Sequence, residues 1–285
     1  MIYQTGQEFR TAAQRRVLLF GMSGLGKTTL SNMLREAGGW FHYSVDYRIG
    51  TRYMNEYIAD NFKREAMKVP LLRELLLSDS VYIASNITFD NLAPLSTYLG
   101  KPGDPGRGGV DFAEYQRRQA QHATAEVAAL LDTTRFIARA QDIYGYSNFV
   151  CDTSGSICEV VNADDPADPV MTELSQHLLM VWIKGSDAHR VELARRFDRA
   201  PKPMYYRPEV LLALWAEFCE GRDTVDPDAF LRFGYARLLD ARQPRYAAMA
   251  RWGVTVTAEQ VARVQDAAGF DDLIAAALDH PQSAA

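Results

Sequence analysis

The chain has 285 residues, of which 47% are hydrophobic and 24% are charged, and these ordinary globular values exclude wholesale disorder. Asp and Glu (36) outnumber Lys and Arg (31), and the formal net charge of −5 argues against broad nucleic-acid coating, which needs excess cations. No apolar run reaches the roughly 20 residues that cross a bilayer. Residues 1–16 lack the apolar core of a signal peptide, and the three cysteines form no Cys-x-x-Cys pair, so we expect a cytoplasmic protein.

Five short segments carry the continuous apolar or β-branched pattern that is typical of strands buried on both faces of a sheet. They are residues 17–20, 41–45, 148–151, 178–183 and 253–256. Helical patterns lie between them, and the first ends at Gly38 and Gly39, which are typical C-terminal caps. Strands that alternate with helices predict an α/β fold with a parallel five-strand sheet flanked by helices.

The stretch between the second and third predicted strands is far longer than one crossover connection needs. It contains a long helical pattern from residue 112 to about residue 141. The face that we expect to be buried there comprises Val127, Leu130, Leu131, Thr134 and Ala138. We therefore predict a single domain over residues 1–285 with a helical insertion at residues 53–145. The insertion either packs around the sheet or binds a second substrate, and the sequence leaves both open.

The strongest motif follows the first predicted strand and precedes a helix: Gly-Met-Ser-Gly-Leu-Gly-Lys-Thr fits G-x-x-x-x-G-K-[ST] in full. Glycines allow backbone N–H groups to turn inward around phosphate oxygens, and the helix N-terminus adds its positive dipole end. Lys27 supplies a charge for the β- and γ-phosphates, and the Thr28 hydroxyl can bind Mg²⁺. The residues expected to contact nucleotide are Gly21, Met22, Ser23, Gly24, Leu25, Gly26, Lys27, Thr28 and Thr29.

Carboxylates end two of the predicted strands. Asp46 follows the second strand, where it could orient or deprotonate an acceptor hydroxyl, although a helix N-cap is the alternative role. Arg48 and Arg52, four residues apart, could hold an anionic group of the acceptor or form a solvated helix face. Asp152 ends the third strand and could bind Mg²⁺ together with Thr28.

A basic segment follows the fourth predicted strand. Residues 184–207 contain seven Lys or Arg residues and three Asp or Glu residues, in a chain of net negative charge. We predict a lid at residues 185–207 that closes over a triphosphate and brings Arg195 and Arg199 to the transferring phosphoryl group. The alternatives are a solvated amphipathic helix and a surface that binds an RNA backbone.

Four functions remain compatible with a phosphate loop: a small-molecule kinase, a GTPase switch, a mechanical ATPase and a polynucleotide kinase. Asp152-Thr153-Ser154-Gly155 fits the Asp-x-x-Gly of GTPases, but no Asn-Lys-x-Asp guanine motif is present. Asp152 is followed by Thr153 and not by the glutamate that polarises water in mechanical ATPases. These absences favour a kinase.

The motifs together resemble the shikimate kinase-like and gluconate kinase-like branch of P-loop kinases. The strand-two motif of that branch, often Asp-x-Asp-x-x-Ile-Glu, is matched at Asp46 and Ile49, whereas Ser44 and Gly50 depart from it. The resemblance covers the core strands, the loop and the lid, but not the long insertion. It implies the strand order 2-3-1-4-5, ATP and Mg²⁺ as cofactors, and an acceptor contact through backbone N–H groups near Ser154 and Gly155.

We therefore predict an ATP-dependent kinase that transfers the γ-phosphoryl group to a hydroxyl of a small molecule. Lys27, Asp46, Asp152 and the lid arginines are the expected catalytic residues. The alternative is a regulatory ATP-binding NTPase or a polynucleotide kinase with a protein or RNA partner. The identity of the acceptor is not encoded in any motif of the chain.

Overall fold

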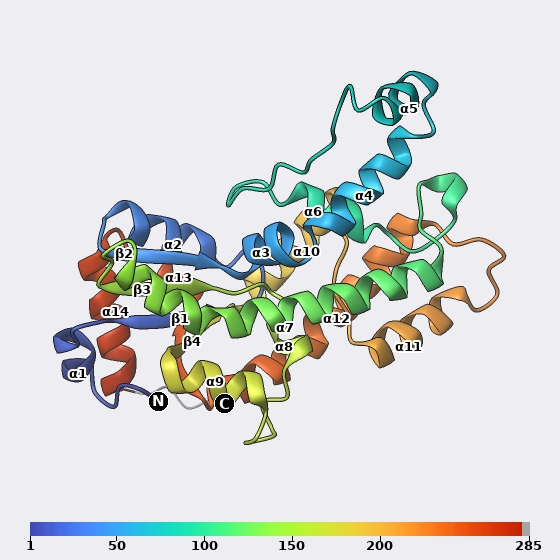
Figure 1. The fold of residues 1–285 in the computed structure, drawn as a ribbon. Coiled ribbons are helices and arrows are strands. Elements are labelled where there is room, and N and C mark those ends of the chain that lie inside the picture. The colour runs from blue at the N-terminus through green and yellow to red at the C-terminus, as the bar shows by residue number, and fades with distance from the viewer. Residues whose placement is uncertain (281–285) are drawn as a thin grey trace.

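The computed structural model describes residues 1–280, and at its centre lies a sheet of five parallel strands (Figure 1). The strands are β1 (Arg16–Phe20), β2 (Trp40–Ser44), β3 (Asn148–Asp152), β4 (Leu179–Lys184) and β5 (Gly253–Thr257). Their order across the sheet is β2-β3-β1-β4-β5. The predicted fold class, sheet and strand order are thus confirmed.

The strand register places several polar residues at one edge of the sheet. Asp152, the last residue of β3, lies opposite Leu19 on β1 and Ser44 on β2. The carboxyl ends of the three strands therefore meet where the phosphate motif begins, at the edge that binds ligands in open parallel sheets.

Each strand differs from its predicted range by one residue at one end or both, and two of these differences have a clear local cause. Val45, predicted to end the second strand, instead begins the short helix α3 (Val45–Arg48), because the Ser44 side chain accepts a hydrogen bond from the Tyr47 amide and caps that helix. Leu178 precedes β4, since its amide still bonds to the Leu174 carbonyl and closes helix α9 (Pro169–His177).

Helices cover the sheet on both sides (Figure 1). Helix α2 (Lys27–Glu36) packs against β2 and β3, α14 (Ala267–Asp279) packs against β5, and α1 (Gly6–Thr11) packs on α14. Helices α9, α13 (Ala258–Val261) and α12 (Pro227–Ala250) also contact the sheet, as does the long α7 (Phe112–Asp142), while the short α8 (Ile157–Val160) packs on α7 and α12. Among residues 1–280, no helix is both long and apolar enough to cross a membrane.

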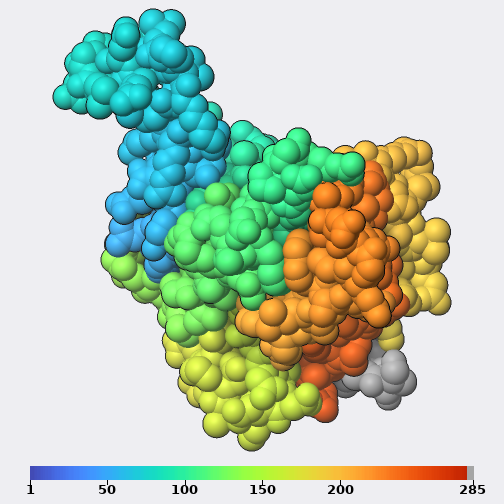
Figure 2. Space-filling view, turned by 90° about the vertical axis from the view of Figure 1, so that its right-hand side faces the viewer, coloured from blue at the N-terminus to red at the C-terminus, as the bar shows by residue number. Residues whose placement is uncertain are grey.

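The segment between β2 and β3 contains several helices. It contains α3, a π-helical turn η1 (Ile49–Tyr53), α4 (Asn55–Ala66), α5 (Pro70–Leu77), α6 (Ala93–Leu99), a 3₁₀ turn η2 (Pro105–Arg107) and α7 (Phe112–Asp142). Figures 1 and 2 show α5 standing away from the body of the molecule. None of its residues is buried.

The long helix α7 spans 31 residues, close to the predicted range. The predicted buried face was right for Leu130, which is fully buried, but wrong for two of its five residues. Leu131 is 39% exposed and Ala138 is also exposed, whereas Glu126, His122 and Thr133 are buried. An apolar pattern cannot identify this face, because part of it consists of buried polar side chains, among them Glu126, which accepts hydrogen bonds from Ser154 and Ser156 after β3.

A second helical group follows β4. Helix α10 (Asp187–Arg199) packs on α12, and α11 (Pro208–Cys219) also contacts α12. Helix α10 and the extended residues after it coincide with the segment predicted as a lid. A Cβ built on Gly24 would lie 2.7 Å from Cδ2 of Leu193, so α10 lies directly against the phosphate motif.

Candidate active site

The phosphate loop adopts a conformation that depends on its glycines. Gly21, Gly24 and Gly26 have φ values of 138°, 87° and 93°, which residues with a side chain rarely adopt. A Cβ on Gly21 would also lie 2.6 Å from the Ile183 carbonyl oxygen. Helix α2 begins at Lys27 with neither a side-chain cap nor an acidic residue in its first turn. Its first N–H groups are therefore suited to an anion.

Lys27 points into the loop and is only 6% exposed. Its Nζ donates to the carbonyl oxygens of Gly21, at 2.9 Å, and Met22, at 3.0 Å. Burial lowers the pKa of Lys27, and the nearby carboxyl groups of Asp152 and Asp46 oppose that shift. The ammonium group therefore lies between the loop and two acidic side chains.

Thr28 and Asp152, the two predicted metal ligands, lie side by side. The Thr28 hydroxyl donates to Oδ2 of Asp152 at 2.7 Å, and Nε2 of the buried His42 lies 3.7 Å from the same oxygen. A hydroxyl and a carboxylate are hard oxygen donors that fit Mg²⁺. No group of three or more His, Cys, Asp or Glu residues within 1–280 could hold a metal, so substrate oxygens and water would have to complete the shell.

Asp46 lies in the first turn of α3, where the cap is Ser44, so the proposed N-cap role of Asp46 is wrong. The pKa of Asp46 is raised to about 6, mainly by burial and also by the nearby Asp152 carboxylate, while the Lys27 ammonium acts in the opposite direction. A carboxyl with this pKa changes protonation close to neutral pH, which suits a general base.

A cavity of about 500 Å³ opens beside the phosphate loop and is lined in part by Ser23, Gly24 and Asp46. Ser154 and Gly155, predicted to contact the acceptor, also line it. A Cβ on Gly155 would collide with the Ser23 hydroxyl and lie 3.0 Å from the Ser23 amide nitrogen, so the turn after β3 packs closely against the phosphate loop.

A second cavity, of about 390 Å³, lies on the other flank of the same loop. It is lined mainly by apolar side chains, among them Leu25, Leu30, Met33 and Val261, and Gly24 borders both cavities. The phosphate loop therefore separates an apolar cavity from one that contains a carboxyl group.

Two predicted acceptor residues do not line either cavity. The Arg48 guanidinium donates to Asp132 through Nε at 2.8 Å and Nη2 at 2.5 Å, and it lies over the Phe136 ring. Arg52 is exposed to solvent. In this conformation Arg48 stabilises the junction of α3 and α7 instead of facing the cavity.

The arginines of the predicted lid differ in their position relative to the larger cavity. Arg195 is exposed and donates to Glu192 at 2.7 Å, and Arg199 is exposed. Arg196 also bonds to Glu192 at 2.7 Å, but it lines the larger cavity, which neither Arg195 nor Arg199 does. The catalytic roles of Arg195 and Arg199 therefore stay predictions that require further closure of α10.

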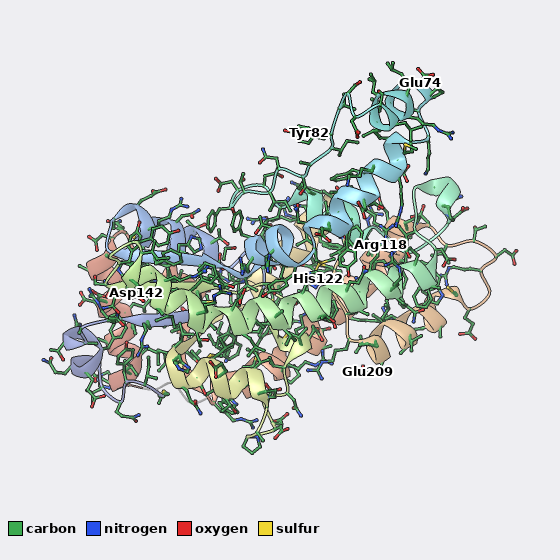
Figure 3. The ribbon with its side chains drawn as sticks, viewed as in Figure 1. Glu74, Tyr82, Arg118, His122, Asp142 and Glu209 are labelled. Carbon is green, nitrogen blue, oxygen red and sulfur yellow. The ribbon has the colours of Figure 1, made fainter. Side chains whose placement is uncertain are left out.

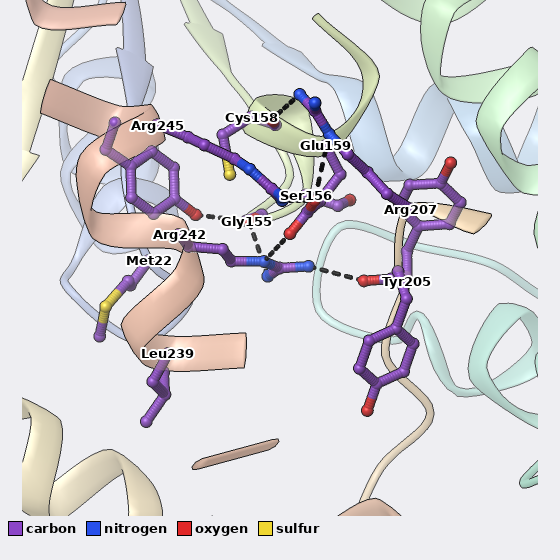
Figure 4. Close-up of polar contacts among 12 residues, drawn as sticks. Met22, Gly155, Ser156, Cys158, Glu159, Tyr205, Arg207, Leu239, Arg242 and Arg245 are labelled. Carbon is purple, nitrogen blue, oxygen red and sulfur yellow. Dashed lines mark hydrogen bonds and ion pairs between the residues drawn. The ribbon is translucent and has the colours of Figure 1, made fainter. Parts of the chain in front are cut away.

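Arg242 is a central residue that the sequence analysis missed (Figure 4). It is 4% exposed and lines the larger cavity. Its guanidinium donates to Oε1 of Glu159 at 2.8 Å, the Gly155 carbonyl at 2.9 Å and the Tyr205 carbonyl at 2.8 Å. Arg242 thus ties α12 to the turn after β3 and to the segment after α10. No local pattern distinguishes it from the other arginines of α12.

Glu126 and His122 were also not predicted, because no local pattern of residues distinguishes them on α7. Figure 3 shows His122 near the middle of α7, and the buried Glu126 is one turn further on. The Ser154 and Ser156 hydroxyls both donate to Glu126. Burial raises the pKa of Glu126 to about 7 and lowers the pKa of His122 to about 4. Between these pH values both side chains are predominantly uncharged.

Comparison with known proteins adds little to this description. No protein-family model matches the chain, and no curated protein matches it. Among solved structures the chain is similar to a shikimate kinase from Bacteroides thetaiotaomicron, with a TM-score of 0.37 and 14% identity over 91% of this chain and 94% of that one. A similarity this low supports no argument about the site, so the function must be argued from the residues described above.

Proposed function

We propose that the protein is an ATP-dependent kinase that transfers the γ-phosphoryl group to a hydroxyl of a small molecule. The observation that supports this most is the position of the phosphate loop between two cavities, one apolar and one containing Asp46. A two-substrate transfer needs such an arrangement, because donor and acceptor must approach the same phosphoryl group from opposite sides.

In this proposal the donor occupies the phosphate loop and the apolar cavity. The adenine base fits the cavity of about 390 Å³ between α2 and α13. The N–H groups of the loop and the Lys27 ammonium hold the β- and γ-phosphoryl groups. Thr28 and Asp152 would hold Mg²⁺, which when bound neutralises charge on the phosphate oxygens.

The acceptor occupies the larger cavity. Asp46 accepts the proton of the acceptor hydroxyl as the oxygen attacks, and Ser154 and Gly155 position the acceptor. Arg196 lies at the same cavity and can stabilise charge on the transferring group, while Arg195 and Arg199 would join it only on further closure.

The test measures ADP production from Mg²⁺-ATP with and without fractionated pools of hydroxylated metabolites. A kinase should produce ADP at least about tenfold faster with one pool, and mass spectrometry should find a product heavier by one phosphoryl group. Lys27→Ala is the matched negative control. Slow hydrolysis that no pool accelerates would contradict the proposal and favour a regulatory NTPase.

A further inference from the structure

The larger cavity has two chemically different walls. The polar wall is formed by side chains from the strand ends, α7 and α12, namely Asp46, Ser154, Ser156, His122 and Arg242. The apolar wall is formed mainly by α6, α10 and α12 and comprises Leu95, Leu99, Leu193, Phe197 and Tyr235, with Leu92 just before α6.

The apolar wall is held in place from two sides. Helix α6 packs on α4 and α7, whereas α10 packs on α12. The rings of Phe197 and Tyr235 are stacked, with centroids 3.7 Å apart and planes 6° from parallel. Because Leu193 of α10 also lies against Gly24, the apolar wall begins next to the phosphate loop.

The polar wall offers hydrogen bonds but little net charge apart from Asp46. The Arg242 guanidinium is already bonded to Glu159 and to two carbonyl groups. Ser154 and Ser156 bond to Glu126, whose raised pKa leaves it largely neutral just below pH 7. The other cations of the cavity, Arg196 and Lys202, are exposed to solvent.

We propose that the phosphoryl acceptor is an amphipathic alcohol, with an uncharged hydroxyl-bearing end against the polar wall and an aromatic or alkyl group against the apolar wall. A small, wholly polar acceptor would leave the leucine and aromatic side chains in contact with water, whereas an apolar group removes that surface from water. A cavity of about 500 Å³ is also large enough for such a molecule. This inference rests on the proposed function, which assigns the cavity to the acceptor.

The experiment uses two matched pairs of probes: glycerol with 3-phenoxypropane-1,2-diol, and glucose with phenyl β-glucoside. Binding to the full chain is measured by calorimetry and ligand-observed NMR without nucleotide, so that the result does not depend on phosphoryl transfer. The phenyl-bearing member of at least one pair should bind about tenfold tighter or more than its polar partner, because its ring is buried.

Variants test whether that preference arises in this cavity. Leu95→Ser and Leu193→Ser should reduce the preference to about threefold or less, because each places a hydroxyl in the apolar wall. Ser96→Phe is a second kind of variant that blocks the cavity from a partly buried position and should weaken phenyl binding without deleting core volume. Leu71→Ser and Leu77→Ser, on the exposed α5, are the matched controls and should leave binding unchanged.

Equal binding within both pairs, or no binding of either phenyl compound at millimolar concentration, would overturn the inference. A phenyl preference that survives all three cavity variants would also overturn it. The two proposals fail in distinguishable ways. Phosphoryl transfer to purely polar alcohols alone refutes the amphipathic acceptor but keeps the kinase. A cavity-dependent phenyl preference without phosphoryl transfer to any alcohol refutes the kinase, and with it the role of acceptor, but keeps the cavity as a site for an amphipathic alcohol.

Discussion

The two sides of the phosphate loop are built in different ways. The phosphate site on the proposed nucleotide side depends on one contiguous motif, in which backbone N–H groups and three glycines with positive φ create the anion site. The acceptor side is assembled from side chains of α3, α6, α7, α10 and α12, which are separated by up to about 200 residues along the chain. A site made of backbone is therefore visible in a short motif, whereas a site made of distant side chains is not.

The largest effect should come from the nucleotide side. Lys27→Ala should reduce ATP turnover by about 10²- to 10³-fold, because the ammonium is the cation that the loop holds against the phosphoryl groups. Steady-state ADP production measures this, and thermal denaturation checks the fold. Lys68→Ala, an exposed lysine beyond α4, is the control and should retain wild-type turnover. Normal turnover in a folded Lys27→Ala protein would remove the assigned role of the loop.

Asp46→Asn examines the acceptor side alone. Transfer should fall by about 10²-fold, the scale of a lost general base. ATP affinity should change little, since Asp46 lines the larger cavity and not the apolar one. Calorimetry with a non-hydrolysable ATP analogue, together with turnover, separates these quantities. A variant with weak nucleotide binding and intact transfer would reverse the assignment of the two sides.

The pH dependence should report the same carboxyl group. Asp46 must be deprotonated to accept a proton, and its pKa is raised to about 6. The transfer rate should therefore rise with pH up to about pH 7 and fall about tenfold for each pH unit below 6. The rate measured from pH 4.5 to 8.5 tests this, and the residual activity of Asp46→Asn should lack the inflection. A flat wild-type profile would exclude Asp46 as the base.

The smallest effect concerns α10, which borders the acceptor side. Arg196→Ala should lower turnover by about two- to fivefold, because the Arg196 side chain lines the cavity but is exposed to solvent. The effect should be smaller at high salt, which screens an exposed charge. Arg195→Ala, which removes only an exposed pair with Glu192, should have less effect. If Arg195→Lys and Arg199→Lys instead impair turnover more than Arg196→Ala while ADP affinity is unchanged, α10 must close further during the reaction.

Much of the fold could be predicted because the signals are local. Each strand is a short apolar run, and all five lie within one or two residues of their predicted bounds. The order of the strands came from the resemblance to known kinases and is confirmed by the register. Thr28 and Asp152 lie next to each other because β1 and β3 are neighbours in the parallel sheet, so the residues that follow their carboxyl ends meet. Their role as metal ligands stays a prediction.

The residues around the larger cavity could not be predicted in the same way. The apolar pattern of α7 selected Leu131 and Ala138, both exposed, and passed over Glu126, which is buried by the loop after β3. Arg48 was predicted to contact the acceptor or solvent, but it pairs with Asp132. That partner lies 84 residues away in the sequence, so no spacing of residues could predict the pair. In each case the deciding contact is with a residue that is remote in sequence.

The sequence by itself determined the parallel sheet, the phosphate loop and the carboxyl groups at the strand ends, because periodicity, glycine conformation and hydrogen bonding act over a few residues. Only the tertiary structure decided which side chains form the acceptor cavity, that Arg242 joins three segments, and that Arg196 and not Arg195 or Arg199 borders the cavity. The physical reason is that burial and desolvation depend on packing between distant elements, which no short pattern of residues records.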